Sequence, residues 1–402
     1  MPEANFREEL IVFFLASWYP NRLDPLNGIF IKRHAESVSK YCKVAVICAV
    51  PDRKLKTKTY DLDCSRNASL LTVRVYYKPT LEHIKIPGVN LFRYVRASYL
   101  GFRQARKLIG NPDILHVNVG YPSGILAFVL RKLIGYKYVI TEHSSAYTRE
   151  DGRYIGSPLY VRLATRCIYK NAEAVIAPSK YLLNALKTSD LVANHGVVIP
   201  NVVDIPKRIH PKPRYTGPAK VLTVSSLTDR DKNLASLIRS FAAVSSPVSE
   251  MELHIIGDGP DRTQLENLAV RLGQLNKGIF FHGLVSPEKL RSFYEEAPFF
   301  VINSNYETFS VATAEALAYG VPVIISRCGG PEEYVSRNEG VVIEKRNDRQ
   351  LVQALSFMCE NWRRYERRSI HEYAKRQFNP ERVGNALFEV YNRVLNNPHS
   401  QD

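Results

Sequence analysis

Short apolar runs alternate with longer mixed segments along most of the chain. In the first half the runs are LIVFFLA (10–16), KVAVICAV (43–50), DILHVNV (113–119), KYVITEH (137–143) and AVIAPS (174–179). In the second half they are KVLTVSS (220–226), MELHIIGDG (251–259), IFFHGL (279–284), PFFVINS (298–304) and VPVIIS (321–326). Continuous apolar strands that alternate with helix-length segments predict parallel sheets covered on both faces. The expected fold class is therefore α/β, with doubly wound parallel sheets.

The two sets of strands predict two domains. The segment HGVVIPNVVDIPKRIHPKPRYTGPAK lies between them and carries four prolines from Pro206 to Pro218. We place the boundary near residue 200, which gives one domain over 1–200 and a second over 201–379. A last helix is expected at about 380–398, because Val383, Leu387, Val390, Tyr391 and Val394 form one apolar helical face. This face alone fits simple packing on the nearer, second domain.

The composition is that of a globular protein from a reducing compartment. The chain has 402 residues, 45% hydrophobic and 23% charged, and no run reaches the ~18 apolar residues of a spanning helix. The first apolar run follows an acidic FREEL, so we interpret it as a buried strand rather than a signal peptide. The 6 cysteines are scattered without CxxC spacing, which predicts free thiols and a cytoplasmic location.

The net charge of +16 is concentrated in the first half. Residues 1–200 hold 29 Lys and Arg against 15 Asp and Glu, a net of +14, which leaves +2 for residues 201–402. The first half is therefore expected to approach an anionic partner, such as acidic phospholipid, nucleic acid or an anionic acceptor. A basic surface that is merely solvated is the alternative.

The segment 91–110, LFRYVRASYLGFRQARKLIG, is the most basic helix-length stretch of this half. Its aromatic residues alternate with five basic residues: Arg93, Arg96, Arg103, Arg106 and Lys107. A helix of this kind is typical of docking on an anionic membrane surface. Binding to nucleic acid and ordinary packing of an amphipathic helix remain as alternatives.

Polar residues follow the strands of the second half. Arg230 and Lys232 come after KVLTVSS, Gly257 and Gly259 lie in GDG, Gly283 ends IFFHG, and RCGG comes after VPVIIS. In open parallel sheets, ligands bind outside the carboxyl ends of the strands. Glycines let a backbone approach a ligand, and helix starts and basic side chains favour anions. These residues together predict a phosphate or nucleotide site.

The segment NYETFSVATAEALAYGVPVI (305–324) places two carboxylates, Glu307 and Glu315, in a stretch of small and apolar residues. Ser310 is the expected N-cap of a helix and Gly320 its C-terminal stop. A buried carboxylate requires a partner. Glu307 and Glu315 are expected to accept hydrogen bonds from ligand hydroxyls, as in a sugar; the alternative is that Glu315 faces solvent.

The first half has a comparable set of strand-end residues. Gly28 lies at the entry to a basic helix after the first strand, and His143 ends the strand KYVITEH. A histidine in such a position is either a polar ligand contact and acid–base group or a packed structural residue. His116 lies inside its apolar strand and is expected to be structural.

The order and spacing of these motifs resemble the retaining GT-B glycosyltransferases of family 4. The Glu307/Glu315 pair resembles their paired-glutamate signature. Further similar segments are SWYPNRLDPLNGIFIKRHAESV, PDILHVNVGYPSG, YVITEHSS, VIPNVVD, VLTVSSLTDRDKN, LHIIGDGPDRTQLE and FHGLVSPEKLRSFY, so that the resemblance covers nearly the whole chain. It implies two facing Rossmann-like domains with a cleft between them, and a last helix that crosses back onto the first domain.

The resemblance also implies roles for individual residues. The second domain would bind a UDP-, GDP- or similar nucleotide sugar, without a cofactor. Glu307 would contact the sugar hydroxyls and Glu315 the ribose, and the backbone of Phe309, Ser310 and Val311 would meet the sugar and the diphosphate. The remaining implied contacts are Lys232 with the diphosphate, Gly28 near the phosphate, His143 near the sugar, and Gly257 and Gly283 in the donor site.

One position departs from the family. Many members carry Gly-Arg-Leu after the first donor-domain strand, whereas this chain has Ser225, Ser226 and Leu227. The diphosphate therefore lacks one expected cation near Ser226, and we hypothesise that Arg230 replaces it. The sequence shows no convincing metal-ligand cluster; DLDC (61–64) lies in a polar stretch away from the strand ends.

The leading interpretation is a retaining, metal-independent hexosyltransferase on the cytoplasmic face of a membrane. It would transfer a sugar from the nucleotide donor to a lipid-linked or cell-envelope glycan acceptor, and nucleic acid is not an expected partner. A transferase with a soluble acceptor is the nearest variant. The alternatives are a sugar-nucleotide epimerase of the same fold and a basic protein that binds nucleic acid or anionic lipid through a degenerate site.

Overall fold

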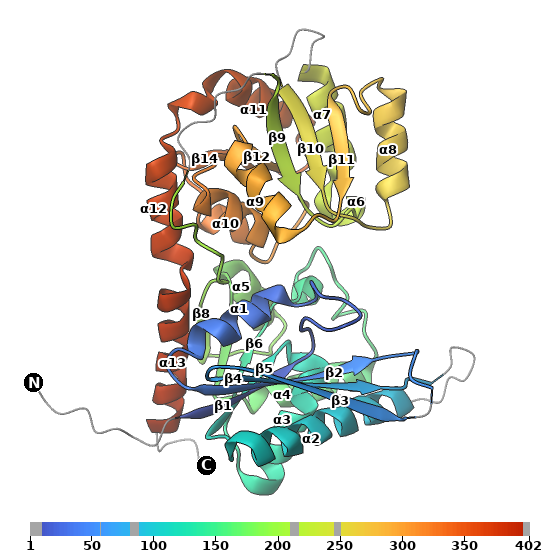
Figure 1. Ribbon diagram of the computed structural model, residues 1–402, viewed down its shortest axis with the longest axis vertical. Helices are drawn as coiled ribbons and strands as arrows, with labels where there is room; N and C mark the ends of the chain where they lie inside the picture. The colour runs from blue at the N-terminus through green and yellow to red at the C-terminus, as the bar shows by residue number, and fades with distance from the viewer. Residues whose placement is uncertain (1–9, 57, 81–87, 210–216, 245–250, 397–402) are drawn as a thin grey trace, which may run out of the picture. The chain divides into compact units, whose positions relative to one another are not determined.

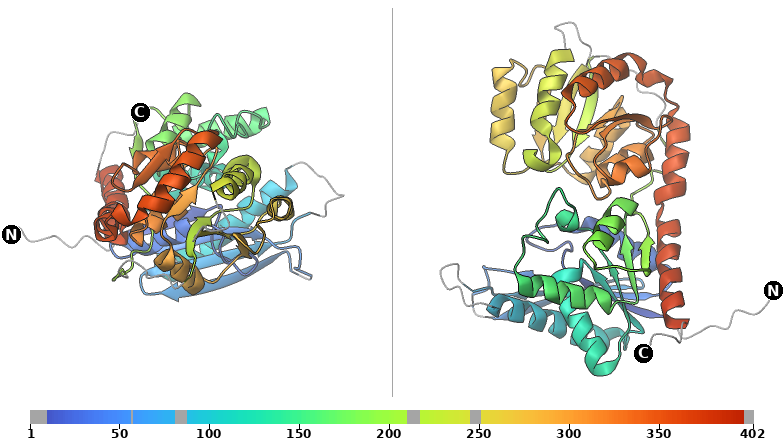
Figure 2. Two further views of the ribbon diagram at one scale, coloured as in Figure 1. Left: turned by 90° about the horizontal axis from the view of Figure 1, so that it is seen from above. Right: turned by 180° about the vertical axis from the view of Figure 1, so that it is seen from behind.

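The computed structural model describes residues 10–56, 58–80, 88–209, 217–244 and 251–396. The chain forms two compact units (Figures 1 and 2). Unit 1 comprises Met1–Val202 and Pro380–Asp402, and unit 2 comprises Val203–Asn379. The first division lies close to the boundary expected near residue 200, and the second places the last helix in unit 1.

Unit 1 is built on an eight-stranded sheet with the order β3-β4-β2-β1-β5-β6-β7-β8. The strands are β1 (Ile11–Ala16), β2 (Lys43–Pro51), β3 (Tyr60–Asn67), β4 (Leu70–Tyr77), β5 (Ile114–Asn118), β6 (Tyr138–Thr141), β7 (Ala174–Ala177) and β8 (Gly196–Val198). The helices are α1 (Ile29–Val38), α2 (Val89–Ile109), α3 (Gly120–Ile134), the 3-10 helix η1 (Ser145–Tyr147), α4 (Leu159–Lys170), α5 (Lys180–Thr188) and α13 (Pro380–Asn396).

The alternation of side chains along β1 explains why this sheet has two buried faces. Val12 and Phe14 pack in a cluster that includes residues of α1 and α13, whereas Phe13 and Leu15 pack in a cluster that includes residues of α2, α3 and α4. Helices therefore cover both faces (Figure 1), as the continuous apolar runs predict.

Unit 2 is built on a six-stranded sheet with the order β11-β10-β9-β12-β13-β14. The strands are β9 (Ala219–Val224), β10 (Met251–Ile256), β11 (Ile279–Gly283), β12 (Phe300–Ile302), β13 (Val323–Ser326) and β14 (Gly340–Ile343). The helices are α6 (Asp229–Lys232), α7 (Leu234–Val244), α8 (Arg262–Arg271), α9 (Pro287–Glu296), α10 (Val311–Ala318), η2 (Gly330–Glu333), α11 (Asp348–Asn361), η3 (Trp362–Arg364) and α12 (Arg367–Phe378). All of its strand pairs are parallel.

The sheet of unit 1 differs from the expected all-parallel sheet at one edge. β3 pairs antiparallel with β4 and is mostly exposed, and it contains the DLDC segment that the sequence analysis left without secondary structure. A short, charged, exposed edge strand is a common way to prevent edge-to-edge association. Such a strand carries no apolar run, so the pattern used for the buried strands did not detect it.

The last helix packs on unit 1. Val383, Leu387, Val390, Tyr391 and Val394 all lie in the cluster that contains Val12 and Phe14. The Tyr391 hydroxyl also bonds Nδ1 of the buried His116 at 2.6 Å, and Thr141 Oγ1 lies 2.6 Å from Nε2 of the same ring. His116 is therefore the structural residue that the sequence predicts. α13 packs on unit 1, as the resemblance implies, and not as the apolar face alone had suggested.

Candidate active site

The strand order of each unit reverses at one point, and this point locates the candidate site. In unit 2 the reversal lies between β9 and β12, and in unit 1 between β1 and β5. Ligands of doubly wound sheets bind at the carboxyl ends of the strands beside such a switch point. The segment after β9 carries Lys232, and the segment after β12 carries Glu307. The fold therefore brings together two residues that lie far apart in the sequence.

Lys232 and Glu307 form an ion pair with Nζ 2.6 Å from Oε1, and only 19% and 14% of the two side chains are exposed. The Ser304 hydroxyl donates a second hydrogen bond to the same Glu307 oxygen at 2.8 Å. Burial lowers the pKa of Lys232, but the Glu307 carboxylate outweighs burial and the net pKa is raised. Lys232 therefore stays cationic at neutral pH, in a position where it can bind an anion.

The backbone around Glu307 is held by the segment that follows β13. The Glu307 amide donates to the Cys328 carbonyl at 2.7 Å, and the Gly330 amide donates to the Glu307 carbonyl at 2.8 Å. A Cβ on Gly330 would lie 2.4 Å from the Thr308 carbonyl oxygen, so a side chain is excluded there. The RCGG motif thus supports the loop that carries Glu307.

Phe309, Ser310 and Val311 form the entry to α10. The Phe309 ring is buried against Tyr334 and Phe378. Ser310 has φ 62°, and its hydroxyl accepts a hydrogen bond from the Thr313 amide, which makes it the expected N-cap. Val311 begins the helix. The first amides of a helix have no partners within the helix and favour anions, so this entry suits a phosphate.

Glu315 has a partner within unit 2. Its side chain is half-buried, and the Tyr294 hydroxyl donates to Oε2 at 3.2 Å. Tyr294 in turn stacks on Tyr319, with ring centroids 5.3 Å apart. The carboxylate is therefore stabilised by a phenol on α9, which the sequence pattern did not indicate because it depends on how α9 packs.

Gly257 and Gly283 join the ends of neighbouring strands. A Cβ on Gly257 would lie 1.8 Å from the Ser225 carbonyl oxygen, and the Gly257 amide donates to the Gly283 carbonyl at 2.9 Å. Ser226 lies exposed in the loop that packs against Gly257. These residues form one edge of the site.

Arg230 lies exposed on α6. Asn305 links it to a second basic residue, Arg346, which the sequence analysis did not single out. The Asn305 side chain donates to the Arg230 carbonyl oxygen at 2.7 Å, and Arg346 Nε donates to Asn305 Oδ1 at 3.1 Å. Arg346 follows β14, a four-residue strand that was not predicted. Because β14 was not predicted, the sequence pattern did not place Arg346 at the carboxyl end of a strand.

Gly28 and His143 occupy the corresponding edge of unit 1. Gly28 has φ 63°, and a Cβ there would lie 2.6 Å from the Trp18 carbonyl carbon, so only glycine fits. His143 is buried, with ring centroids 4.5 Å from Phe30 and 5.6 Å from His34. Burial, aided by the neighbouring histidines, holds the pKa of His143 well below its ordinary value. His143 is therefore neutral at physiological pH.

Glu142 positions the His143 segment, and the sequence analysis assigned it no role. Its carboxylate accepts hydrogen bonds from the amides of Gly120, His143 and Ser144 at 2.9, 2.8 and 2.7 Å, and from the Tyr169 hydroxyl. Burial raises the pKa of Glu142, although these donors act in the opposite direction. The buried Glu142 carboxylate thus fixes the backbone beside His143.

The basic segment 91–110 is the helix α2, and its two faces differ. Tyr94 and Phe102 are buried in the unit 1 core, whereas Phe92 and Tyr99 are exposed. The basic side chains of Arg96, Arg103, Arg106 and Lys107 are exposed, and Arg93 donates to the Lys78 carbonyl at 2.7 Å. The helix therefore packs as an amphipathic helix and also presents a basic, aromatic face.

Two kinds of feature are absent from the described residues. None of the described helices is both long enough and apolar enough to cross a membrane. The described residues also contain no group of three or more His, Cys, Asp or Glu arranged to hold a metal ion.

Solved structures of similar architecture define the class of fold. Sucrose-phosphate synthase from Thermosynechococcus elongatus superposes with a TM-score of 0.76 at 19% identity, covering 96% of this chain and 99% of that one. Anabaena Alr3699/HepE in complex with UDP and glucose superposes with a TM-score of 0.70 at 15% identity, covering 96% and 100%. The chain has the GT-B fold, as the resemblance implies.

Two family models together match residues 38–377. Residues 38–207 match Glycosyltransferase Family 4, and residues 204–377 match Glycosyl transferases group 1. The chain therefore belongs to the group 1, family 4 type of glycosyltransferases, which confirms the resemblance carried by its motifs.

Two curated relatives illustrate the range of the family. The alpha-monoglucosyldiacylglycerol synthase of Streptococcus pneumoniae is 26% identical over 267 residues, which is 60% of this chain but only 58% of the relative. The putative teichuronic acid biosynthesis glycosyltransferase TuaC of Bacillus subtilis is 22% identical and covers 95% of this chain and 98% of its own length.

Proposed function

We propose that this glycosyltransferase transfers a hexose, with retention of configuration and without a metal ion, from a nucleoside-diphosphate sugar to a lipid-linked or cell-envelope glycan. The observation that carries the proposal is the Lys232–Glu307 ion pair at the switch point of unit 2. A cation held in a polar, half-enclosed position suits a diphosphate, and a carboxylate beside it suits sugar hydroxyls.

The chemistry of the leaving group explains why these residues matter. Transfer breaks the bond between the anomeric carbon and the diphosphate oxygen, so negative charge develops on the diphosphate. Lys232 and the entry to α10 would stabilise that charge without a metal ion. Glu307 would accept hydrogen bonds from the sugar, and Glu315, held by Tyr294, from the ribose. Retention requires that the acceptor oxygen bonds on the face from which the diphosphate departs.

The donor class is supported by a protein of similar structure. Anabaena Alr3699/HepE, which shares the fold over 96% of this chain, is described with UDP and glucose bound. The donor-site residues proposed here are Gly28, Lys232, Gly257, Gly283, Glu307, Phe309, Ser310, Val311 and Glu315, with His143 near the sugar. Arg230 would contribute a cation in place of the one missing at Ser226.

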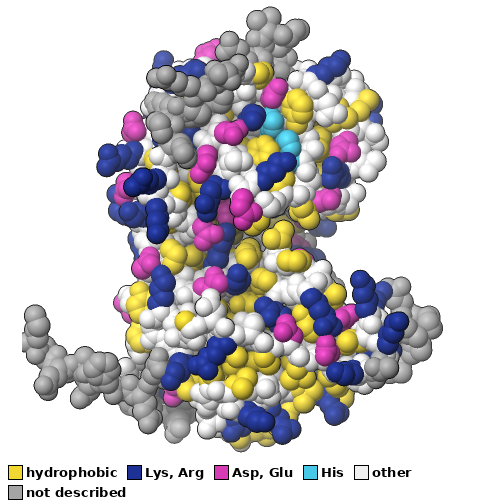
Figure 3. Space-filling view, viewed as in Figure 1, with side chains coloured by type: hydrophobic (Ala, Val, Ile, Leu, Met, Phe, Trp, Pro, Cys, Tyr) yellow, Lys and Arg dark blue, Asp and Glu magenta, His cyan; other side chains and the backbone are white. Residues whose placement is uncertain are grey.

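The acceptor class is supported by the names of the relatives and by the surface of unit 1. One relative is named for a glycosylated diacylglycerol and the other for teichuronic acid synthesis. Basic and hydrophobic side chains mix over α2 and α3, where Phe92, Leu133 and Ile134 are exposed (Figure 3). A surface of this composition suits the anionic cytoplasmic face of a membrane. The protein would therefore act as a peripheral membrane enzyme.

The function is tested with a panel of nucleotide sugars, scored by thermal shift and by release of nucleoside diphosphate. We expect one donor class to raise the Tm and to be hydrolysed slowly without acceptor. Glu307→Gln should lower kcat/KM by about 100-fold, because the amide no longer provides two acceptor oxygens for the sugar hydroxyls. Arg271→Gln is the matched control, because Arg271 is an exposed residue of α8 in the same unit.

Each alternative predicts a different result. An epimerase would convert the donor without an acceptor and release little free nucleotide. A binding protein with a degenerate site would show no turnover, and Glu307→Gln would change nothing. Either outcome contradicts the proposal, as does a glycosidic product of inverted configuration for its stereochemical part.

A further inference from the structure

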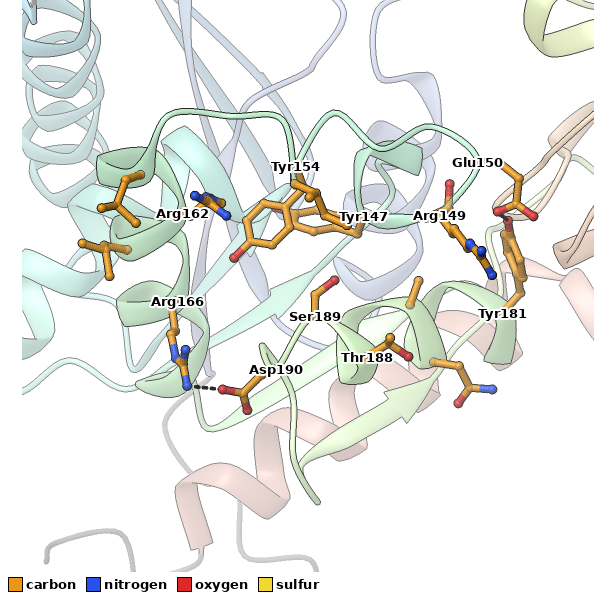
Figure 4. Close-up of a pocket in the computed structure, with 16 residues that line it drawn as sticks. Tyr147, Arg149, Glu150, Tyr154, Arg162, Arg166, Tyr181, Thr188, Ser189 and Asp190 are labelled. Carbon is orange, nitrogen blue, oxygen red and sulfur yellow. Dashed lines mark hydrogen bonds and ion pairs between the residues drawn. The ribbon is translucent and has the colours of Figure 1, made fainter.

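Unit 1 contains a pocket of about 860 Å³ that is lined by none of the candidate-site residues. It lies between the segment after β6, the helix α4 and the helix α5 (Figure 4). All of its lining residues come from 147–190, so it belongs wholly to unit 1. Pockets that hold small ligands have volumes of about 300–1,000 Å³, and this pocket is at the large end.

Much of the pocket lining is apolar and open to solvent. Ile155, Leu159 and Leu163 line it and are 65%, 62% and 54% exposed. The rings of Tyr147 and Tyr154 pack together beside them, with centroids 5.0 Å apart. Large apolar side chains gathered in one exposed pocket are uncommon in a protein without a binding role for them.

The charged groups of the pocket leave positive charge available. The acids are occupied: Glu150 accepts from the Tyr181 hydroxyl at 2.8 Å, and Asp190 pairs with Arg166 and with Lys170. Arg149 and Arg162 form no ion pair with any residue that the structure describes, and Arg162 Nε is buried without a hydrogen-bond partner there. Figure 4 shows Arg162 beside Tyr154, where it borders the apolar part of the pocket.

The pocket is connected to the candidate site through buried tyrosines. Tyr147 lines the pocket and follows His143 in the same segment. The Tyr169 hydroxyl lies 3.3 Å from the Tyr147 hydroxyl and donates to Glu142, whose carboxylate holds the His143 amide. A ligand in the pocket would therefore lie against the same segment that carries His143.

We propose that this pocket binds an anionic amphiphile, with its hydrocarbon chain against Ile155, Leu159 and Leu163 and its phosphate at Arg162. The occupant would be the lipid part of the acceptor, so the inference rests on the proposed glycosyl transfer to a lipid-linked acceptor. The apolar walls would hold the hydrocarbon chain. Arg162, whose Nε has no hydrogen-bond partner among the described residues, would hold the phosphate, because guanidinium groups bind phosphate with two parallel hydrogen bonds.

The test measures binding of monomeric dodecyl phosphate to the full chain by calorimetry, below its critical micelle concentration. Dodecyl maltoside provides the same chain without the charge, and inorganic phosphate provides the charge without the chain. We expect dodecyl phosphate to bind at least about tenfold more tightly than either. Leu163→Asp and Arg162→Gln should each weaken binding by about tenfold or more. Leu62→Asp is the matched control, because Leu62 is an exposed leucine of β3 outside the pocket.

Four results would overturn this inference. Equal binding of inorganic phosphate would indicate a site for free phosphate, and equal binding of dodecyl maltoside would remove the role of Arg162. Equal losses for Leu163→Asp and Leu62→Asp would indicate non-specific adsorption. UDP binding is measured on the same samples: if UDP binds and dodecyl phosphate does not, the pocket assignment fails while the transferase proposal stands. Failure of every nucleotide sugar and of UDP to bind would instead refute the proposed function.

Discussion

At the scale of single residues, the candidate site is centred on the ion pair between Lys232 and Glu307, to which Ser304 adds a hydrogen bond. Lys232 and Glu307 both follow strands, and strand ends of a parallel sheet converge, so their proximity could be expected. Their direct ion pair and the Ser304 hydrogen bond could not, because they depend on side-chain geometry. The Tyr294 partner of Glu315 likewise depends on the packing of α9.

The cation missing at Ser226 gives a first prediction at this scale. Arg230 binds Asn305 through its backbone carbonyl and Arg346 binds it through its guanidinium, so both residues are candidates to supply charge to a bound diphosphate. If Arg230 replaces the missing arginine, Arg230→Ala should raise the donor KM or lower kcat by about tenfold or more, and Arg346→Ala should have a smaller effect. The measurement is steady-state kinetics with the donor varied. Unchanged kinetics in Arg230→Ala would refute its role, and a larger loss in Arg346→Ala would transfer that role to Arg346.

The buried histidines of unit 1 give a second prediction. Burial lowers the pKa of His34 to about 4, and it lowers the pKa of His116 and His143 well below their ordinary value. A histidine whose pKa is lower in the folded state takes up a proton on unfolding at acidic pH. The free energy of unfolding should therefore fall as the pH drops below ~6.5, by up to about 1.4 kcal/mol per pH unit for each histidine.

His34→Gln removes one of the three groups that take up a proton on unfolding, and it keeps a polar side chain. Its free energy of unfolding between pH 6.5 and 5 should therefore depend less steeply on pH than that of the parent, by about 1 kcal/mol per pH unit. Urea titrations that follow Trp18 in a Trp362→Phe background report on unit 1, because each unit contains one of the 2 tryptophans. Equal pH slopes in the two proteins would show that His34 titrates normally.

At the scale of secondary structure elements, most of the buried strands could be predicted from the sequence. The strands that were missed show where an apolar pattern is not enough. β1, β2, β5–β7 and β9–β13 are continuous apolar runs, and all ten form where expected. β4 was missed because Arg74 interrupts its apolar pattern. The Arg74 side chain does not enter the core; it donates to the Pro20 carbonyl and pairs with Asp63. β8 and β14 were also missed; both are edge strands that are only partly buried.

The helix α2 gives a prediction at the same scale. Its inward face is fixed by packing, so the exposed Arg103, Arg106 and Lys107 are available to a membrane surface. Each such residue contributes about 1 kcal/mol near anionic lipid. The combined substitutions Arg103→Glu, Arg106→Glu and Lys107→Glu should abolish flotation with vesicles rich in phosphatidylglycerol. Arg271→Glu on α8 of unit 2 serves as the control and should float normally.

The salt and lipid dependence of flotation separates this electrostatic docking from other modes. Binding by the parent protein should weaken strongly at about 1 M salt, where charges are screened beyond a few ångströms. It should also require anionic lipid. Flotation with neutral vesicles, or flotation that persists at high salt, would contradict docking through α2.

At the scale of the whole molecule, the chain passes twice between the two units, at Val202–Val203 and at Asn379–Pro380. The second passage makes unit 1 discontinuous in sequence. An apolar helical face identifies a buried helix but not its partner, so the periodicity of 383–394 alone was compatible with either unit. The partner is decided by the unit 1 sheet, where Tyr391 meets His116 and Leu387 enters the cluster of Val12 and Phe14.

This arrangement makes unit 1 dependent on the last residues of the chain, whereas unit 2 is continuous over Val203–Asn379. Leu387→Ala should therefore lower the free energy of unfolding of unit 1 by about 2–5 kcal/mol, the usual cost of removing a fully buried leucine side chain. Urea unfolding followed at Trp18, with Trp362→Phe, should shift to lower urea, while unfolding followed at Trp362, with Trp18→Phe, should shift far less. Arg393→Ala, an exposed position on the same helix, should leave both transitions within about 0.5 kcal/mol of the parent. An equal shift at both tryptophans would show that the two units unfold as one cooperative body, and a shift at Trp362 alone would contradict the docking of α13 on unit 1.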